Sequence, residues 1–138
     1  MTAFVLDASI ALSWCFQDEA TSTTWALLDR LEREAAAVPV LWFLELGNIL
    51  SAAERRGRLT SARSAEFLNL LDGLDIQTDD ETAPRALRET LALAKAQNIT
   101  TYDACYLELA MRLGVPLATK DARLAQAASR LGVPVLGG

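Results

Sequence analysis

Short apolar runs that alternate with longer helical segments constrain the fold of this chain more than any other feature. Each run is too short for a helix, and polar, proline or glycine residues lie beside it, which is typical of a buried strand. Strands that alternate with helices indicate an α/β fold, with a parallel sheet covered on both faces and right-handed crossovers. We expect four to five strands, at residues 4–6, 39–41, 75–78, 117–119 and 135–136.

Helical spacing of apolar residues fills most of the intervals between these runs. Gly57 follows one of the longest helical patterns and is expected to end it in a left-handed conformation. The pentapeptide Arg-Leu-Gly-Val-Pro occurs at residues 112–116 and again at 130–134, and each copy predicts a helix end, a glycine cap and a strand start. The expected helices cover residues 8–16, 21–34, 42–56, 61–71, 81–97 and 101–113, with a last helix after Asp121.

Length and composition favour one globular domain spanning residues 1–138. The 138 residues suffice for one core, and 51% of them are apolar and 22% charged. The start of the chain lacks the pattern of a secretion signal or membrane span, so we expect a cytoplasmic protein without a membrane partner. Cys15 and Cys105 lack the spacing of a metal site, and we expect both to be free thiols.

The absence of histidine limits the chemistry that this chain can perform. It excludes Ser-His-Asp and Cys-His triads, histidine-ligated zinc and imidazole acid–base catalysis. Catalysis would have to use carboxylates, hydroxyls, lysine or metal ions. The 13 basic and 18 acidic residues give a net charge of -5, which disfavours broad contact with nucleic acid unless bound cations reverse the charge locally.

Four acidic residues lie where the carboxyl ends of parallel strands would meet. Asp7 ends the first strand, and Asp121 lies two residues beyond the fourth. Glu45 lies in the helix after the second strand, and Asp103 lies at the start of another helix. Because ligands of open α/β sheets collect at this edge, we expect the four side chains to converge there.

Each acid also has a purely structural explanation. Asp7 and Asp121 could cap the helices that follow them. The charge of Asp103 would be favourable in the first turn of a helix. Glu45 is harder to explain in this way, because it lies in an apolar segment where an unpaired charge is costly to bury. Asn48, three residues later, shares the helical face of Glu45 and is an accessory site candidate.

Converging carboxylates would repel one another, and a divalent cation would relieve that repulsion. Two like charges about 4 Å apart repel by roughly 1 kcal/mol in water and by about 4 kcal/mol at an effective dielectric constant of 20. Oxygen ligands without histidine or cysteine favour hard cations, here Mg²⁺ or Mn²⁺. A metal-activated water could then attack a phosphodiester without imidazole. The expected metal ligands and catalytic residues are therefore Asp7, Glu45, Asp103 and Asp121.

Four segments of the chain resemble the PIN-domain ribonucleases, specifically the VapC-type toxins of bacterial toxin–antitoxin pairs. They are VLDAS at residues 5–9, Glu45 with Asn48 in the helix after Pro39, TYDACYL at residues 101–107 and LATKD at residues 117–121. The segments occur in the order found in that family, and the likeness runs nearly from end to end.

The resemblance implies a three-layer α/β/α PIN-like domain that cleaves RNA endonucleolytically with Mg²⁺ or Mn²⁺. It also implies a homodimer and a cognate antitoxin partner, whose basic C-terminal tail would fit an acidic site. Ser9 and Thr119 match hydroxyl positions that assist metal or water placement in such proteins. The acidic quartet of the family corresponds to Asp7, Glu45, Asp103 and Asp121.

Basic and aromatic residues are further candidates for contact with RNA, and each has a structural alternative. Lys120 could neutralise Asp121 or touch the substrate. Arg55, Arg56 and Arg58 could contact phosphates or could interact favourably with the dipole of the helix that ends beside them. Four aromatic residues are expected in the core rather than on a base-stacking surface: Trp14, Trp25, Trp42 and Tyr102.

Two other functions fit parts of the pattern. A phosphotransfer module of the receiver type would also bind Mg²⁺ and could use Thr119 and Lys120. Such modules need paired acids just after the first strand, however, and this chain has Ala8 and Ser9 there. A non-catalytic interaction protein with a PIN fold would keep the acidic groove and would bind basic peptides in it.

Overall fold

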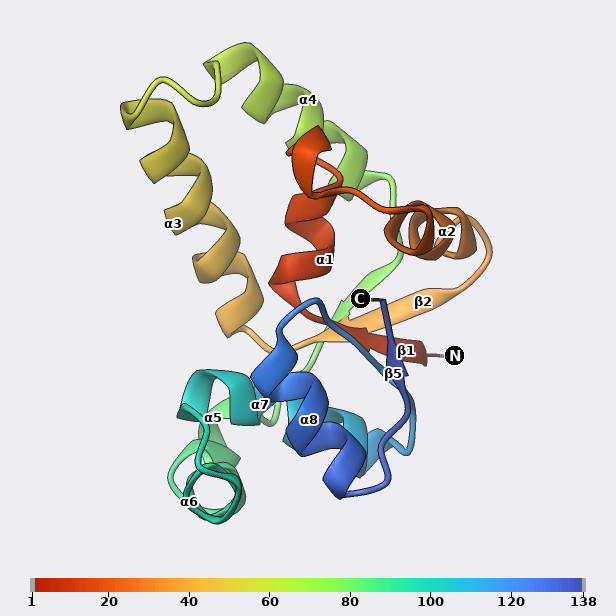
Figure 1. Ribbon diagram of the computed structural model, residues 1–138, viewed down its shortest axis with the longest axis vertical. Coiled ribbons are helices and arrows are strands. Elements are labelled where there is room, and N and C mark those ends of the chain that lie inside the picture. Colours follow the sequence, from red (N-terminus) through yellow and green to blue (C-terminus); the bar gives the residue numbers. More distant parts are fainter. Residues whose placement is uncertain (1, 138) are drawn as a thin grey trace.

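A five-stranded parallel sheet organises the computed structural model, which describes residues 2–137 (Figure 1). The order in the sheet is β3-β2-β1-β4-β5, so that β1 is central. All neighbouring strands are parallel, and the α/β fold class expected from the sequence is confirmed. The strands are β1 (Thr2–Leu6), β2 (Ala35–Val38), β3 (Ile76–Thr78), β4 (Leu117–Ala118) and β5 (Val135–Leu136).

Helices cover both faces of this sheet. Figure 1 shows α1 to α4 above the sheet and α5 to α8 below it, which gives the three layers expected for the fold. No helix within residues 2–137 is both long and apolar enough to cross a membrane. The helices are α1 (Ala8–Ser13), α2 (Ser22–Arg30), α3 (Leu41–Arg55), α4 (Ser61–Asp72), α5 (Thr82–Ala86), α6 (Glu89–Gln97), α7 (Thr101–Leu113) and α8 (Ala122–Arg130), with the short 3₁₀ helix η1 (Gln17–Glu19).

The position of the second strand differs from the sequence prediction. Residues 39–41 were expected to form it, but β2 ends at Val38, immediately before Pro39. Because β2 lies between β1 and β3, a proline within it would leave a ladder hydrogen bond unmade. The strand contains three alanines, which do not favour strands locally, and all four of its residues are buried. Burial between two helical layers therefore overrides the weak local preference.

The helix predicted over residues 81–97 is also wrong, because the chain forms two helices there. α5 ends at Ala86, and α6 begins at Glu89 after Arg88 adopts φ -121° and ψ -101°. The break lets Arg85 approach Glu108 of α7 at 3.8 Å while it pairs with Glu81 at 3.1 Å. Arg85 also lies 3.9 Å from Glu89 of α6, so ion pairing that joins three helices accompanies the break.

Several predicted helix ends are confirmed. Gly57 has φ +73°, and the two glycines of the repeated pentapeptide, Gly114 and Gly132, have φ +69° and +76°. In this left-handed region a side chain would strain the backbone, so glycine ends each of these helices; Gly114 and Gly132 each precede a strand.

The aromatic residues divide between core and surface. Trp14 and Trp42 are buried as expected, and Trp14 Nε1 donates to the carbonyl oxygen of Thr24 at 2.8 Å. The same expectation is wrong for Trp25 and Tyr102, whose exposed fractions are 41% and 62%.

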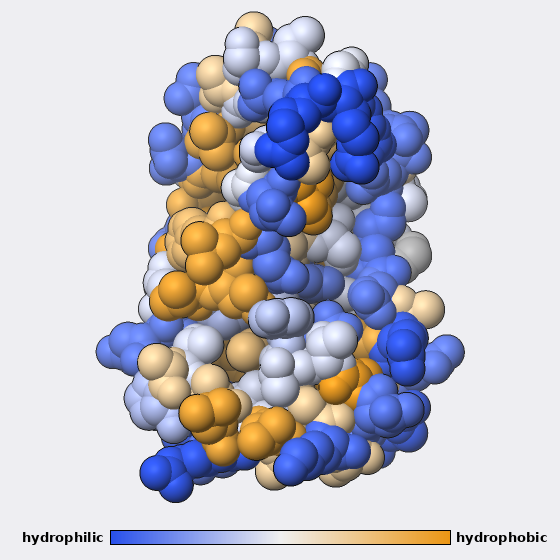
Figure 2. Space-filling model, turned by 90° about the vertical axis from the view of Figure 1, so that its left-hand side faces the viewer, coloured by the Kyte–Doolittle hydropathy of each residue, from blue (hydrophilic) through white to orange (hydrophobic). Residues whose placement is uncertain are grey.

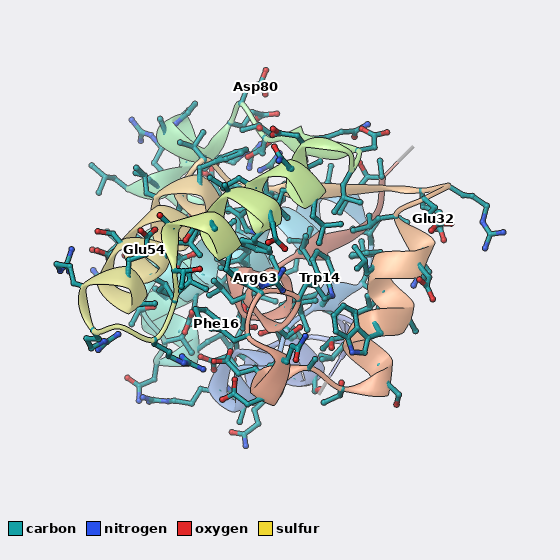
Figure 3. All side chains as sticks on the ribbon, turned by 90° about the horizontal axis from the view of Figure 1, so that it is seen from above. Trp14, Phe16, Glu32, Glu54, Arg63 and Asp80 are labelled. Atoms are coloured by element: carbon teal, nitrogen blue, oxygen red, sulfur yellow. The ribbon has the colours of Figure 1, made fainter. Side chains whose placement is uncertain are left out.

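The end of α1 is tied to α4 by Arg63. Its Nη2 donates to the carbonyl oxygens of Trp14 and Cys15 at 3.2 and 3.3 Å, and Figure 3 shows the two labelled side chains, Arg63 and Trp14, beside each other. These carbonyls have no partner within the helix, so the guanidinium satisfies them. Cys15 and Cys105 are both free thiols, as expected.

Candidate active site

The carboxyl ends of β1 and β4 lie side by side and place Asp7 and Thr119 together. The two strands are parallel neighbours, with Leu6 paired to Ala118, and each is followed by one of these residues. Thr119 Oγ1 donates to Asp7 Oδ2 at 2.6 Å, and Ser9 Oγ donates to the same oxygen at 2.9 Å. The accessory hydroxyls singled out in the sequence therefore both contact Asp7.

Asp7 does not act as a helix cap through its side chain. It occupies the position before α1, but its carboxylate makes no capping hydrogen bond. Only 6% of the residue is exposed. Burial raises the pKa of Asp7 above its ordinary value, although the hydrogen bonds from Thr119 and Ser9 oppose the rise. A buried carboxylate that does not cap its helix fits a functional role better than a structural one.

The two hydroxyls also bind the backbone of the β4–α8 connection. Ser9 Oγ accepts a hydrogen bond from the Lys120 amide at 2.9 Å, and Thr119 Oγ1 accepts one from the Asp121 amide at 3.0 Å. Each hydroxyl thus donates to Asp7 and accepts from the loop that carries Asp121. The arrangement fixes the two acids relative to each other.

Asp121 does cap α8, as the structural alternative proposed. Its Oδ1 accepts a hydrogen bond from the Leu124 amide at 3.0 Å. Capping does not remove it from the acidic site, because its negative charge contributes to the raised pKa values of both Asp7 and Asp103. Asp121 therefore has a structural role and lies within the electrostatic reach of the other two acids.

Asp103 lies in the first turn of α7, where Thr100 caps the helix. Its pKa is raised to about 6, first by burial and then by the negative charges of Asp121 and Asp7, while Arg123 opposes the rise. The favourable dipole at this end of the helix does not prevent the shift. The negative charges of Asp7 and Asp121 thus act on the carboxyl group of Asp103.

Glu45 completes the group from α3. The hydroxyl of Tyr106 on α7 donates a hydrogen bond to Glu45 Oε1. Burial raises the pKa of Glu45, the Tyr106 bond opposes this, and the charges of Asp7 and Asp103 add to the rise. Four carboxylates from separate elements therefore belong to one group whose negative charges influence one another. Asn48, the accessory candidate one turn later, is exposed and makes no side-chain hydrogen bond within residues 2–137.

The donor set fits a hard divalent cation. All four groups are carboxylates; burial is the main cause of the raised pKa values of three of them, and the negative charges of neighbouring acids add a repulsion that a cation would relieve. Across the described part of the chain, no group of three or more His, Cys, Asp or Glu side chains is already arranged to hold a metal ion. This is compatible with Mg²⁺, which binds through one or two carboxylates and keeps several waters.

Lys120 and Arg58 make their contacts away from the four acids. The ammonium of Lys120 donates to the carbonyl oxygen of Glu19, not to the neighbouring Asp121. Arg58 pairs with Asp18 at 3.1 Å and with Glu19 at 2.9 Å, and its guanidinium lies 4.1 Å from the centre of the Phe16 ring. Both cations therefore hold the η1 segment in place.

Asp79 follows β3 at the same edge of the sheet, but the site does not include it. Arg112 binds both of its oxygens, at 3.0 and 2.9 Å. Burial alone would raise the pKa of Asp79, but the contact with Arg112 outweighs it and the pKa is lowered. An acid at the end of a strand therefore does not always belong to the site, because a nearby guanidinium, here that of Arg112, can neutralise it.

Tyr106 was not selected from the sequence as a site residue, although one signal pointed to it. It lies three residues after Asp103, which places the two on the same face of α7. Arg123 was missed as well. It lies two residues after Asp121, and its charge acts on Asp103.

Comparison with known proteins identifies a family and a fold. The sequence model for the PIN domain matches residues 4–130. Significant matches among curated proteins are lacking.

Three solved structures are similar over nearly the whole chain. PAE2754 from Pyrobaculum aerophilum is 24% identical with a TM-score of 0.72, covering 97% of this chain and 83% of that one. VapBC2 from Rickettsia felis, bound to a DNA fragment from its promoter, is 11% identical with a TM-score of 0.70 and 99% coverage of both chains. FitAcB from Neisseria gonorrhoeae is 21% identical with a TM-score of 0.61, covering 96% of this chain and 95% of that one. At these identities the neighbours show the fold.

Proposed function

The chain belongs to the PIN-domain family, and on that premise we propose that it is a metal-dependent endoribonuclease, the toxin of a toxin–antitoxin pair. PIN domains are generally nucleases. The proposal depends on one observation, the shared field of the four carboxylates Asp7, Glu45, Asp103 and Asp121. We assign the catalytic and metal-binding roles to these four residues.

The residues around the acids would position them for phosphodiester hydrolysis. Ser9 and Thr119 hold the Asp7 carboxylate, and Tyr106 holds that of Glu45. Mg²⁺ or Mn²⁺ bound by the four acids would supply positive charge for the phosphate and lower the pKa of a nearby water. Without a cation, burial and neighbouring negative charges raise the pKa values of Asp7, Glu45 and Asp103 and so favour their protonated forms. The same groups would therefore bind a cation in competition with protons.

RNA as the substrate, and the cytoplasm as the location, follow from the likeness to VapC-type toxins. The sequence likeness covers the four acids in order, and two of the structural neighbours are toxin–antitoxin complexes. The family match gives no support to the phosphotransfer alternative. A PIN-fold protein without catalysis remains the alternative that the experiment below must distinguish.

We also propose an antitoxin partner with a basic C-terminal tail, and a homodimer. The net charge of -5 and the acidic site would attract such a tail. A groove of about 720 Å³ between α3 and α4 offers apolar surface for the rest of the partner, and Figure 2 shows hydrophobic side chains gathered over this upper half of the molecule.

Incubation of the purified protein with RNA tests the proposed activity. Parallel reactions should contain Mg²⁺, Mn²⁺ or EDTA, with single-stranded and duplex DNA of matched sequence as other substrates. We expect new RNA ends that depend on a divalent cation and are absent with Asp7→Asn. A folded protein that cleaves no nucleic acid under any of these conditions would support the non-catalytic alternative.

A further inference from the structure

A small hollow with two arginines lies between α8 and the end of α6. Its volume is about 280 Å³, and it is lined by Gln97, Asn98, Ile99, Arg123, Gln126 and Arg130. Arg123 and Arg130 are seven residues apart on α8, which places them two turns apart on one face of the helix. Both guanidinium groups therefore line the same cleft.

Neither arginine is paired with a carboxylate among the residues that the structure describes. Arg123 donates to the Asn98 carbonyl oxygen at 3.5 Å, and Arg130 donates to the Gln97 side chain and carbonyl at 3.0 and 3.4 Å. These acceptors are neutral, so neither guanidinium forms an ion pair within residues 2–137. A guanidinium has five N–H donors, and most of them are still available here.

Five of the eleven arginines form salt bridges with acids among the described residues. Arg58 pairs with Asp18 and Glu19, and Arg112 pairs with Asp79 and Glu108. The hollow thus concentrates positive charge in a protein with a net charge of -5. Arginine binds phosphate oxygens through its planar fork of donors, which makes a phosphate group the suitable ligand.

The hollow also adjoins the acidic site. α8 begins directly after Asp121, and Arg123 lies within its first turn. Arg123 lies two residues after Asp121, whose side chain caps this helix at the Leu124 amide. Arg130 lies about 10 Å further along the helix axis, at a rise of 1.5 Å per residue. The positive charges therefore form a track that leads away from the carboxylates along α8.

We propose that this hollow binds the backbone phosphates of the RNA strand that is cleaved at the carboxylates. The inference rests on the proposed function and adds to it the surface that holds the substrate. It also explains how a protein with excess negative charge can grip RNA, because two unpaired cations flank the acidic site on one side. Arg123 would contact a phosphate near the cleaved bond, and Arg130 one further along the strand.

Salt-dependent binding of RNA tests the proposal. The intact protein would be titrated with a fluorescent single-stranded RNA in EDTA, which prevents cleavage, from 50 to 200 mM salt. Each lost phosphate contact should reduce the slope of log K against log salt by about 0.7. We expect Arg123→Gln and Arg130→Gln each to show this loss, the double variant to show about twice as much, and Arg130→Lys to retain the wild-type slope.

Arg33→Gln is the matched control. Arg33 is exposed and precedes β2, so it lies at the opposite edge of the sheet, and its replacement removes the same charge. Binding by this variant should match that of the wild type. If the double variant instead binds RNA with the same affinity and slope as Arg33→Gln, the hollow is not the RNA site.

Cleavage kinetics separate this inference from the proposed function. If the wild type cleaves RNA, Arg130→Gln should show an increase in KM with little change in kcat, because Arg130 lies two helical turns from Arg123 and would bind substrate away from the acids. Cleavage with an unchanged KM in the double variant would overturn the inference alone. Arginine-dependent RNA binding without any cleavage would overturn the nuclease assignment and retain the binding site.

Discussion

The Thr119 hydroxyl lies 2.6 Å from Asp7 Oδ2, although the two residues are 112 positions apart in the sequence. Thr119 is buried and also accepts a hydrogen bond from the Asp121 amide at 3.0 Å. One hydroxyl therefore joins the end of β1 to the start of α8 and orients two acids of the proposed site.

Thr119→Val should reduce both stability and nuclease activity. Valine has a similar shape but leaves the buried Asp7 carboxylate and the Asp121 amide with fewer partners, at a cost of about 1–3 kcal/mol in the free energy of unfolding. Thr119→Ser keeps the hydroxyl and should lose less of both. Chemical denaturation and RNA cleavage assays measure the two effects. Equal stability and activity in the valine and serine variants would show that the hydroxyl does not position the acids.

Asp103→Asn should stabilise the metal-free protein near neutral pH while it reduces cleavage. The pKa of Asp103 is raised from 3.8 to about 6 in the fold, so the folded state favours the protonated form. Its contribution to stability is therefore fully present below about pH 3.8 and is lost as the pH rises through about 6. Since solvent screens this half-buried group, we expect a gain of only about 1 kcal/mol for Asn at pH 7.

The pH dependence gives the check on this prediction. Free energies of unfolding in EDTA should differ most between Asp103→Asn and wild type at pH 7, and the difference should vanish below about pH 4. If the difference in stability between Asp103→Asn and wild type did not change with pH, the raised pKa of Asp103 could not be its cause.

Tyr106→Phe should lower activity with little change in the fold. Phenylalanine keeps the buried ring but removes the donor to Glu45, so that carboxylate would lose its orientation. A loss of roughly tenfold in kcat is expected for a positioning group of this kind. Tyr102→Phe removes an exposed hydroxyl from the same helix and serves as the control. Equal activity in the two variants would argue against a role for Tyr106.

Arg112→Met should destabilise the protein without impairing the site. The change leaves Asp79 and Glu108 without their partner; because Arg112 is partly exposed, the cost should be lower than about 3–5 kcal/mol, the range typical of breaking a fully buried ion pair. Asp79→Asn in the same chain should recover part of the loss. Cleavage per folded molecule should stay at the wild-type level, since Arg112 neutralises Asp79 and not the four site acids. A large loss of activity at full folding would place this ion-pair network in the active site.

Much of the fold could be predicted from the sequence because its strands and helices have strong local patterns. The strand at residues 4–6, the helix ends at Gly57 and Gly114, and the parallel arrangement are confirmed. β2 was misplaced because its alanines are a poor local signal, and burial between two layers determines its position. The exposure of Trp25 could not be predicted either, since hydrophobicity alone does not say which residues the helices cover.

The contacts within the site are harder to predict from the sequence than the fold is. Asp7 and Asp121 occur in the same local pattern, an aspartate followed by alanine at the start of a helix, yet only Asp121 caps its helix. The difference lies in the hydroxyls of Ser9 and Thr119, one of which comes from a distant strand. The Tyr106–Glu45 contact spans 61 positions and the Arg112–Asp79 contact spans 33. Such pairings depend on tertiary structure and leave little local signal.

Single-turnover cleavage of RNA with Mg²⁺ is the most direct measurement of the central claim, that dispersed acids act together as one metal-dependent site. Wild type should be compared with Asp7→Asn, with Asp103→Asn and with the variant carrying both changes. We expect each single change to reduce the rate at least about a hundredfold and the double change to add little, because groups that act as a unit are not additive. Cleavage that continues in EDTA, or at the wild-type rate in the double variant, would contradict the claim.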